Sequence, residues 1–226
     1  MNDVSSPPHV CAVSYLNTVP LVWGLIHGPQ HGAVDLRFAL PAECAEELRA
    51  GRADVGLVPV AELARQPDLA VVPGSACACR GAVRSILLVS KAPFAEVRTL
   101  AADAGSRTSV VLAQVLLARR HGARPAVETM APRLDAMLER ADAALVIGDP
   151  ALRIDPRLAE WRGAPVQVLD LGAEWFAWTG LPMVFAVWAA KPCVAVEPLA
   201  PLFEASKAWG LERIDDIVAA ESARLD

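Results

Sequence analysis

Short apolar runs alternate with amphipathic segments along the first part of the chain. In one of the runs Asp35 and Arg37 alternate with apolar neighbours, which is the two-residue period of a strand. Pro20 stands in the first turn of the first helical segment, where its missing N–H costs nothing. We predict strands at Val10–Val13, Val34–Leu40 and Ala53–Pro59, and helices at Leu21–Ile26, Pro41–Ala50 and from Val60–Arg65 onward. This β-α-β-α-β order predicts parallel strands with helices on the faces of the sheet.

The pattern restarts after a further apolar run at Arg84–Ser90. A strong helical pattern, Val110–His121, follows the polar segment Ser106–Ser109. We predict the remaining strands at Glu128–Met130, Ala143–Gly148, Val166–Leu169 and Val184–Ala190, and the remaining helices at Leu134–Arg140, Pro198–Trp209 and Ile214–Leu225.

Two strand-like segments, Arg84–Ser90 and Val184–Ala190, connect the two blocks. We therefore expect an α/β chain with two lobes, each a mainly parallel sheet flanked by helices, and a ligand cleft between the lobes. The double crossing makes the first lobe discontinuous. We place it at residues 1–90 plus 184–226, and the second lobe at residues 91–183.

Composition narrows the functional classes. Of the 226 residues 54% are hydrophobic, which is enough for two modest cores, and the net charge of −5 disfavours nucleic-acid binding. The five cysteines form no disulfide framework, no apolar run is long enough to cross a membrane, and the first residues do not resemble a secretory signal. We expect a cytoplasmic protein with a small-molecule partner, and the sequence leaves its oligomeric state open.

Two polar segments stand where a strand gives way to a helix, at Ser14–Thr18 and Ser106–Ser109. Each combines hydroxyl or amide side chains with the free N–H groups of a helix N-terminus, which suits a carboxylate ligand. Arg107 adds a bidentate partner for such an anion. Ordinary helix caps explain the same residues, so both interpretations stay open.

Three further positions are candidates for the wall of the cleft. Ser85 begins the apolar run of the first connecting strand, although a strand end in solvent explains it equally. Thr179 and Gly180 precede the second connecting strand, where a tight turn is the alternative. The nearby aromatic residues lie over a ligand ring or belong to the core; they are Trp175, Phe176 and Trp178.

Motifs for metals and nucleotides are missing. His27 and His31 are separated by a Gly-Pro pair that breaks the helix, and Cys77 and Cys79 lack two further ligands at a suitable spacing. Asp149 follows a predicted buried strand, where it is catalytic or caps the next helix. We find no Walker loop and no dinucleotide-binding glycine fingerprint, so we expect action without a cofactor.

Five segments in this order resemble the chorismate dehydratases of the futalosine pathway to menaquinone. Each segment alone is a weak signal, but their order is fairly specific, and the resemblance extends along nearly the whole chain. The segments are Ser14–Leu21, Ala53–Pro59, Arg84–Ser90, Ser106–Ser109 and Trp178–Pro182.

The resemblance implies a type II periplasmic-binding-protein fold and a cofactor-free hydro-lyase. Such an enzyme converts chorismate, a dicarboxylate, to 3-[(1-carboxyvinyl)oxy]benzoate and water. It implies that Asn17 is catalytic and that Ser85 and the segment Ser106, Arg107, Thr108 and Ser109 contact the substrate. We add Ser14, Thr179 and Gly180 as substrate-binding residues of the expected cleft.

The identity of the base stays open, because the five segments contain no His and no acidic residue that must remove the proton. The enolpyruvyl carboxylate of the substrate itself is one candidate. Two other functions compete: a non-catalytic cytoplasmic binder of a small carboxylate, and the paralogous dihydroxynaphthoate-forming enzyme of the same pathway. We expect that paralogue to carry a catalytic His, and the four histidines here lie outside the five segments. Members of the family usually extend some tens of residues further, and we expect that part to be helical packing on the first lobe.

Overall fold

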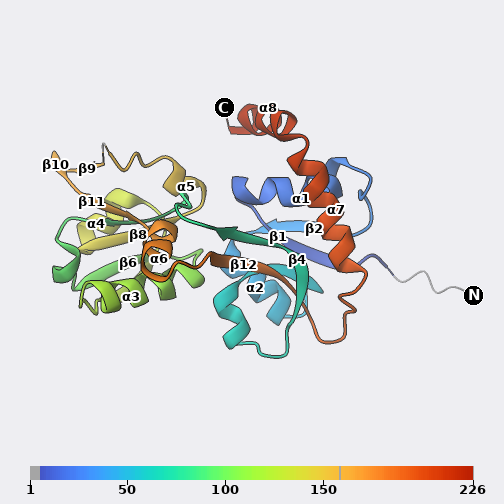
Figure 1. Ribbon diagram of the computed structural model, residues 1–226, viewed down its shortest axis with the longest axis horizontal. Coiled ribbons are helices and arrows are strands. Elements are labelled where there is room, and N and C mark those ends of the chain that lie inside the picture. Colours follow the sequence, from blue (N-terminus) through green and yellow to red (C-terminus); the bar gives the residue numbers. More distant parts are fainter. Residues whose placement is uncertain (1–5, 158, 226) are drawn as a thin grey trace, which may run out of the picture. The chain divides into compact units, whose positions relative to one another are not determined.

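The computed structural model describes residues 6–157 and 159–225. The chain divides into two compact units, each with its own five-stranded sheet flanked by helices (Figure 1). Unit 1 comprises Met1–Cys77 and Ala186–Asp226, and unit 2 comprises Ala78–Phe185. The predicted α/β class is confirmed.

The sheet of unit 1 has the strand order β2-β1-β3-β12-β4. Strand β1 pairs in parallel with β2 and β3, as the β-α-β-α-β pattern predicts, whereas β12 is antiparallel to β3. The strands are β1 His9–Val13, β2 Asp35–Ala39, β3 Val55–Pro59, β4 Ala70–Cys79 and β12 Met183–Ala190. The helices are α1 Val19–His27, α2 Pro41–Arg49, α7 Leu199–Leu211 and α8 Ile214–Leu225.

Helices α1 and α7 lie side by side, and small residues allow the close approach (Figure 1). A Cβ on Gly210 would stand 2.2 Å from the carbonyl oxygen of Pro20. The buried Ser206 hydroxyl donates to the carbonyl of Leu21 at 2.9 Å and accepts the N–H of Leu25 at 3.1 Å. Backbone contact and side-chain hydrogen bonds therefore fix this helix pair.

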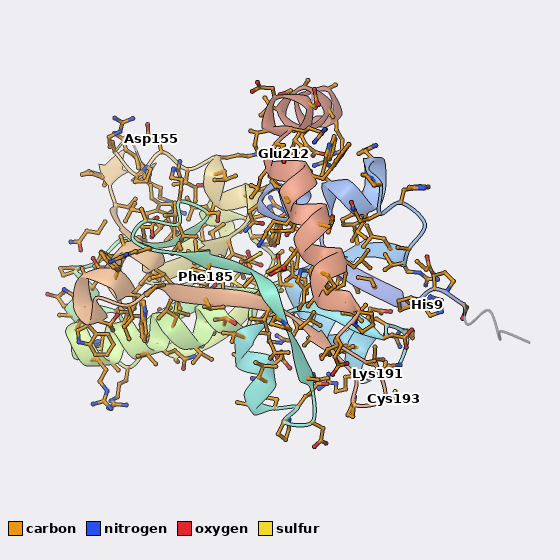
Figure 2. All side chains as sticks on the ribbon, turned by 45° about the vertical axis from the view of Figure 1, so that its right-hand side comes forward. His9, Asp155, Phe185, Lys191, Cys193 and Glu212 are labelled. Carbon is orange, nitrogen blue, oxygen red and sulfur yellow. The ribbon has the colours of Figure 1, made fainter. Side chains whose placement is uncertain are left out.

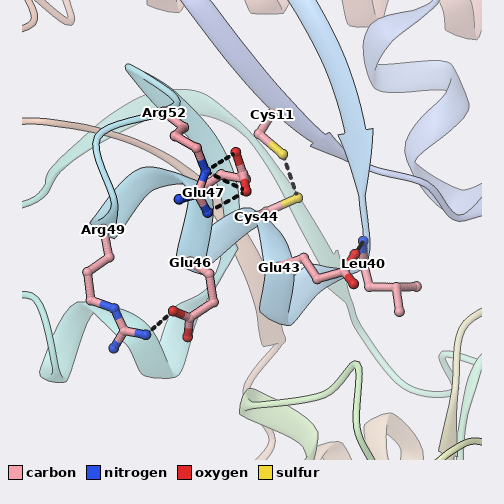
Figure 3. A network of polar contacts seen from close by, with 8 residues as sticks. All are labelled: Cys11, Leu40, Glu43, Cys44, Glu46, Glu47, Arg49 and Arg52. Carbon is pink, nitrogen blue, oxygen red and sulfur yellow. Dashed lines mark hydrogen bonds and ion pairs between the residues drawn. The ribbon is translucent and has the colours of Figure 1, made fainter.

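A pair of buried thiols joins α2 to strand β1 (Figure 3). The sulfurs of Cys11 and Cys44 lie 3.3 Å apart, and the Cys44 thiol also donates to the carbonyl of Ala12 at 3.4 Å. At the start of α2 the Glu43 carboxylate accepts the N–H of Leu40 at 2.9 Å. Burial and local hydrogen bonds thus hold α2 in place.

The sheet of unit 2 has the order β11-β5-β8-β6-β7. Strand β8 is parallel to β6 and antiparallel to β5, and β6 is parallel to β7. The strands are β5 Ile86–Ser90, β6 Thr99–Asp103, β7 Ala126–Met130, β8 Ala143–Ile147 and β11 Gln167–Asp170. The helices are α3 Thr108–Arg120, α4 Leu134–Arg140, α5 Asp149–Leu152 and α6 Leu171–Thr179, and β9 Glu160–Trp161 pairs with β10 Ala164–Pro165.

Three features differ from the predicted organisation. The strand expected to connect the lobes, Arg84–Ser90, is β5 and pairs inside the sheet of unit 2, while the first unit boundary falls within β4. The boundary expected after residue 90 therefore lies earlier in the chain. Both sheets are mixed rather than mainly parallel, because β12 in one and β5 in the other run antiparallel to a neighbour. The segment Val60–Ala64 is a short 3-10 helix, not the start of an α-helix.

Candidate functional site

One edge of the sheet in unit 2 gathers most of the candidate residues. Strands β6 and β8 are parallel, so Asp103 and Ile147 end at the same edge. Strand β5 is antiparallel to both β8 and β11, so Ile86 begins at that edge and Asp170 ends there. The carboxyl ends of parallel strands are the usual ligand edge of an open α/β sheet. We call this set of strand ends the unit 2 edge.

A buried carboxylate shapes the turn between β6 and α3. Asp103 accepts the N–H of Gly105 at 2.8 Å and, with its other oxygen, the N–H of Ile147 at 3.2 Å. Its carbonyl accepts the N–H of Ser106 at 3.0 Å. Burial raises the pKa of the Asp103 carboxyl, and the two N–H groups oppose that rise. The turn is therefore tied to the ends of two strands.

The segment Ser106–Ser109 opens α3 as predicted, and three of its side chains are buried. The Thr108 hydroxyl donates to the carbonyl of Phe185, a residue labelled in Figure 2, at 3.0 Å. Ser106 is 3% exposed, and its hydroxyl has no hydrogen-bond partner among the residues the structure describes. Arg107 is the N-cap residue of α3 and makes no cap hydrogen bond with its side chain. The turn thus combines a helix N-terminus with an unsatisfied hydroxyl.

Ser85 lies at the same edge, directly before β5. It is buried, its N–H donates to the carbonyl of Val83 at 2.8 Å, and its carbonyl accepts the N–H of Gly148 at 2.8 Å. The Ser85 hydroxyl lies 3.5 Å from the carbonyl of Val83, which is long for a hydrogen bond between oxygens. The structure therefore brings Ser85 and the segment Ser106–Ser109 to one sheet edge.

The segment Ser14–Thr18 occupies the equivalent edge of unit 1, where β1 ends. The N–H of Ser14 donates to the carbonyl of Ala39 at the end of β2, at 3.0 Å. Asn17 is exposed and lies in the 3-10 helix Leu16–Thr18 that leads into α1. Thr18 is the N-cap residue of α1 but makes no cap hydrogen bond with its side chain. A cavity of about 360 Å³ beside this turn is lined by Ser14, Tyr15, Trp23, His27, Glu221 and Arg224, among others.

Thr179 and Gly180 terminate α6. The Thr179 hydroxyl donates to the carbonyl of Trp175 at 2.8 Å and accepts the N–H of Leu181 at 3.1 Å. Gly180 has a left-handed backbone with φ of 70°. These contacts are those of a helix-ending turn, the alternative left open by the sequence. Trp175 and Trp178 meet edge to face with ring centroids 6.0 Å apart.

The sequence patterns did not identify two carboxylates that organise the unit 2 edge, namely Asp103 and Asp170. Each accepts backbone N–H groups from segments distant in the chain, and such partners are visible only once the strands are paired. Asp170 is also the N-cap of α6 and accepts the N–H groups of Gly172 and Ala173. An Asp before a short amphipathic segment is the signal that could have identified this helix start.

The described ranges, 6–157 and 159–225, offer neither a metal centre nor a membrane segment. No group of three or more His, Cys, Asp or Glu side chains is arranged there to hold a metal ion. No helix in those ranges combines the length and apolar character needed to cross a bilayer.

Comparison with known proteins adds findings on sequence and on fold. A family model described as menaquinone biosynthesis matches residues 8–226. The chorismate dehydratase of Thermus thermophilus is 32% identical over 205 residues, which cover 83% of this chain and 73% of that protein. These matches extend over both units of the chain.

Solved structures with a similar fold have low sequence identity. Protein AF1704 from Archaeoglobus fulgidus has a TM-score of 0.74 and 17% identity, with 96% of this chain and 81% of that chain covered. The periplasmic aliphatic sulphonate binding protein SsuA from Escherichia coli has a TM-score of 0.58 and 16% identity, with coverage of 93% and 75%. The predicted periplasmic-binding-protein-like fold is thereby confirmed.

Proposed function

Because the chain belongs to the menaquinone biosynthesis family, we propose that it is a chorismate dehydratase. The proposed reaction converts chorismate to 3-[(1-carboxyvinyl)oxy]benzoate and water, in the futalosine pathway and in the cytoplasm. The proton leaves the ring carbon that bears the ether oxygen, hydroxide leaves the ring, and the ring becomes aromatic. Conjugation with the ring carboxylate assists loss of the proton, so orientation and desolvation of the substrate supply most of the catalysis, without a cofactor.

The Ser106–Ser109 turn at the N-terminus of α3 is the single observation that supports the proposal best. The Ser106 hydroxyl is buried without a partner among the described residues, and an unmatched buried hydroxyl is costly unless a ligand satisfies it. The first N–H groups of α3 and the helix dipole favour an anion beside that hydroxyl. We propose that Ser106, Arg107, Thr108 and Ser109 bind one carboxylate of chorismate.

Ser85 is the second proposed contact at the unit 2 edge. Its hydroxyl has only the long contact to Val83, so it is available to a substrate oxygen. In unit 1 we propose that Asn17 positions the substrate or assists the leaving hydroxyl, and that Ser14 contributes a hydrogen bond. The exposure of Asn17 is compatible with a residue that meets a ligand. The proton acceptor is the substrate's own enolpyruvyl carboxylate.

We propose that Thr179 and Gly180 act on the substrate site only through the backbone. The Thr179 hydroxyl is engaged within its own turn, so these two residues contribute by fixing the backbone that leads into β12.

The proposal is tested by incubating the purified chain with chorismate and no added cofactor. We expect the diene absorbance to fall and mass spectrometry to detect a product lighter by one water. Chorismate that binds but persists would instead indicate a carboxylate binder. Turnover of a cyclic futalosine derivative to a dihydroxynaphthoate, with no reaction of chorismate, would indicate the paralogous activity.

A further inference from the structure

The residue before Ser85 has an unusual backbone. Arg84 has φ of +66°, and Arg162 at +52° is the only other non-glycine residue with positive φ among those the structure describes. This region is unfavourable for a residue with a Cβ, so the surrounding contacts must hold it. Arg162 lies in the turn of the short β9–β10 hairpin and is not one of the strand ends that form the unit 2 edge. It therefore serves as a control residue with the same backbone conformation.

The Arg84 side chain binds the carbonyl groups at the end of α5. Its guanidinium donates to the carbonyl of Ala151 at 3.1 Å, to that of Leu152 at 3.2 Å and to that of Ile154 at 2.5 Å. Helix ends leave such carbonyl groups without partners, and the planar guanidinium satisfies several at once. One side chain thus fixes the Arg84 backbone against the segment that follows β8.

The Asp170 carboxylate holds the same turn from the other side. It accepts the N–H of Val83 at 3.0 Å and the N–H of Arg84 at 2.6 Å. It also accepts the N–H groups of Gly172 and Ala173, both at 3.0 Å. Hydrogen bonds to an ionised acceptor are stronger than neutral ones, so this carboxylate joins the turn firmly to the start of α6.

We propose that Arg84 and Asp170 are positioning residues that hold Ser85 where its hydroxyl meets the substrate, an inference that rests on the proposed function. Their hydrogen bonds in this turn go to backbone groups, whereas Ser85 follows directly and its hydroxyl has only a long contact. The carbonyl of Ser85 is fixed in turn by the N–H of Gly148. The effect of the two residues on the reaction therefore passes through Ser85.

The test compares two variants with two matched controls. Asp170→Asn weakens the carboxylate contacts, and Arg84→Gly removes the guanidinium while relieving the positive φ. Asp142→Asn is the control for the first, because Asp142 likewise accepts the N–H groups of Arg98 and Thr99, at 2.9 and 3.0 Å, where β6 begins. Arg162→Gly is the control for the second.

We expect Asp170→Asn and Arg84→Gly each to raise KM for chorismate about tenfold and to change kcat by less than about twofold, as loss of a uniform binding contact does. The two controls should leave KM unchanged. In a Ser85→Ala background neither variant should raise KM further, since residues that act through one contact are not additive. An equal rise in KM in both backgrounds, or in the controls, would overturn the inference.

Amide hydrogen exchange separates this inference from the proposed function. We expect Asp170→Asn to speed exchange at Ser85 and Gly148, while Asp142→Asn leaves both unchanged. If the wild-type chain does not convert chorismate, the proposed function fails, and the exchange rates still decide whether Asp170 holds the turn. Unchanged exchange at both amides in Asp170→Asn would contradict the inference even in an active enzyme.

Discussion

At the scale of single residues, Asn17 offers a direct test of substrate charge. The Asn17→Asp change places a carboxylate where we propose that a dianionic substrate binds. Repulsion of about 2 kcal/mol is reasonable for a partly exposed pair, which corresponds to about a thirtyfold loss of kcat/KM. Because Asn17 is exposed, thermal unfolding should be unaffected. Kinetics with chorismate measure the loss, and a variant as active as wild type would count against the role of Asn17.

Ser106 and Ser90 provide a matched pair of buried serines. Ser106 has no hydrogen-bond partner among the described residues, whereas the fully buried Ser90 hydroxyl donates to the carbonyl of Ala92 at 2.7 Å. Ser106→Ala should leave the free energy of unfolding unchanged or slightly higher, and should raise KM. Ser90→Ala should cost about 1 kcal/mol and leave KM unchanged. Denaturant unfolding and steady-state kinetics give both values; a large loss of stability in Ser106→Ala would mean that its hydroxyl has a structural role.

At the scale of elements, a Gly210→Ala change where α7 contacts α1 has two effects of opposite sign on the free energy of unfolding. Helix propensity alone predicts that Gly210→Ala stabilises α7 by about 1 kcal/mol. The added Cβ would stand 2.2 Å from the carbonyl oxygen of Pro20, and this oxygen belongs to the backbone and cannot rotate away. We therefore expect a net loss of about 1–3 kcal/mol, as in other overpacked sites. Denaturant unfolding measures it, with the exposed Ala205→Gly as the propensity control.

The elements also show how far the sequence predicts the fold. Strand β8 and helix α4 were predictable because β8 is apolar throughout and α4 has clear helical spacing. Strand β4 was not predicted, because Pro73 and Gly74 interrupt it and its burial does not alternate regularly. Helix α6 was missed because its aromatic residues resemble a ligand platform or a core cluster. Strand β6 was missed as well, and with it Asp103, whose partner Ile147 becomes visible only through the pairing of β6 with β8.

At the scale of the whole molecule, local patterns identified two βα blocks but not the place where one unit ends. The segment Arg84–Ser90 has the apolar character of any buried strand, so its sequence does not reveal which sheet it joins. The candidate site was found where a strand is followed by a polar helix start, as at Ser106–Ser109. The two residues that we propose to position Ser85 were not identified from the sequence. Arg84 and Asp170 each bind backbone groups of a segment more than sixty residues away, and such contacts leave no local pattern.

The stability of each unit should respond to acid through a different carboxyl group. In unit 1 the Lys191 ammonium lies 2.8 Å from the Asp54 carboxylate and lowers the pKa of that carboxyl. The backbone N–H of His9 also donates to Asp54, and Figure 2 labels both Lys191 and His9. A lowered folded-state pKa gives stability that is present above the unfolded value of about 3.9 and is lost as the pH falls through the folded value. Burial raises the pKa of Asp103 in unit 2, so its contribution has the opposite sign and falls as the pH rises above about 3.9.

We therefore expect Asp54→Asn to lower the melting temperature at pH 7 and to have a progressively smaller effect as the pH falls below about 3.9 toward the lowered pKa of Asp54. Lys191→Met, which removes the partner and keeps most of the side-chain volume, should show the same dependence on pH. The exposed pair of Arg140 and Glu128 serves as a control, because Glu128→Gln should change the melting temperature little at any pH. A loss in Asp54→Asn that is the same at pH 7 and in acid would mean that the charge of Asp54 is not what stabilises unit 1.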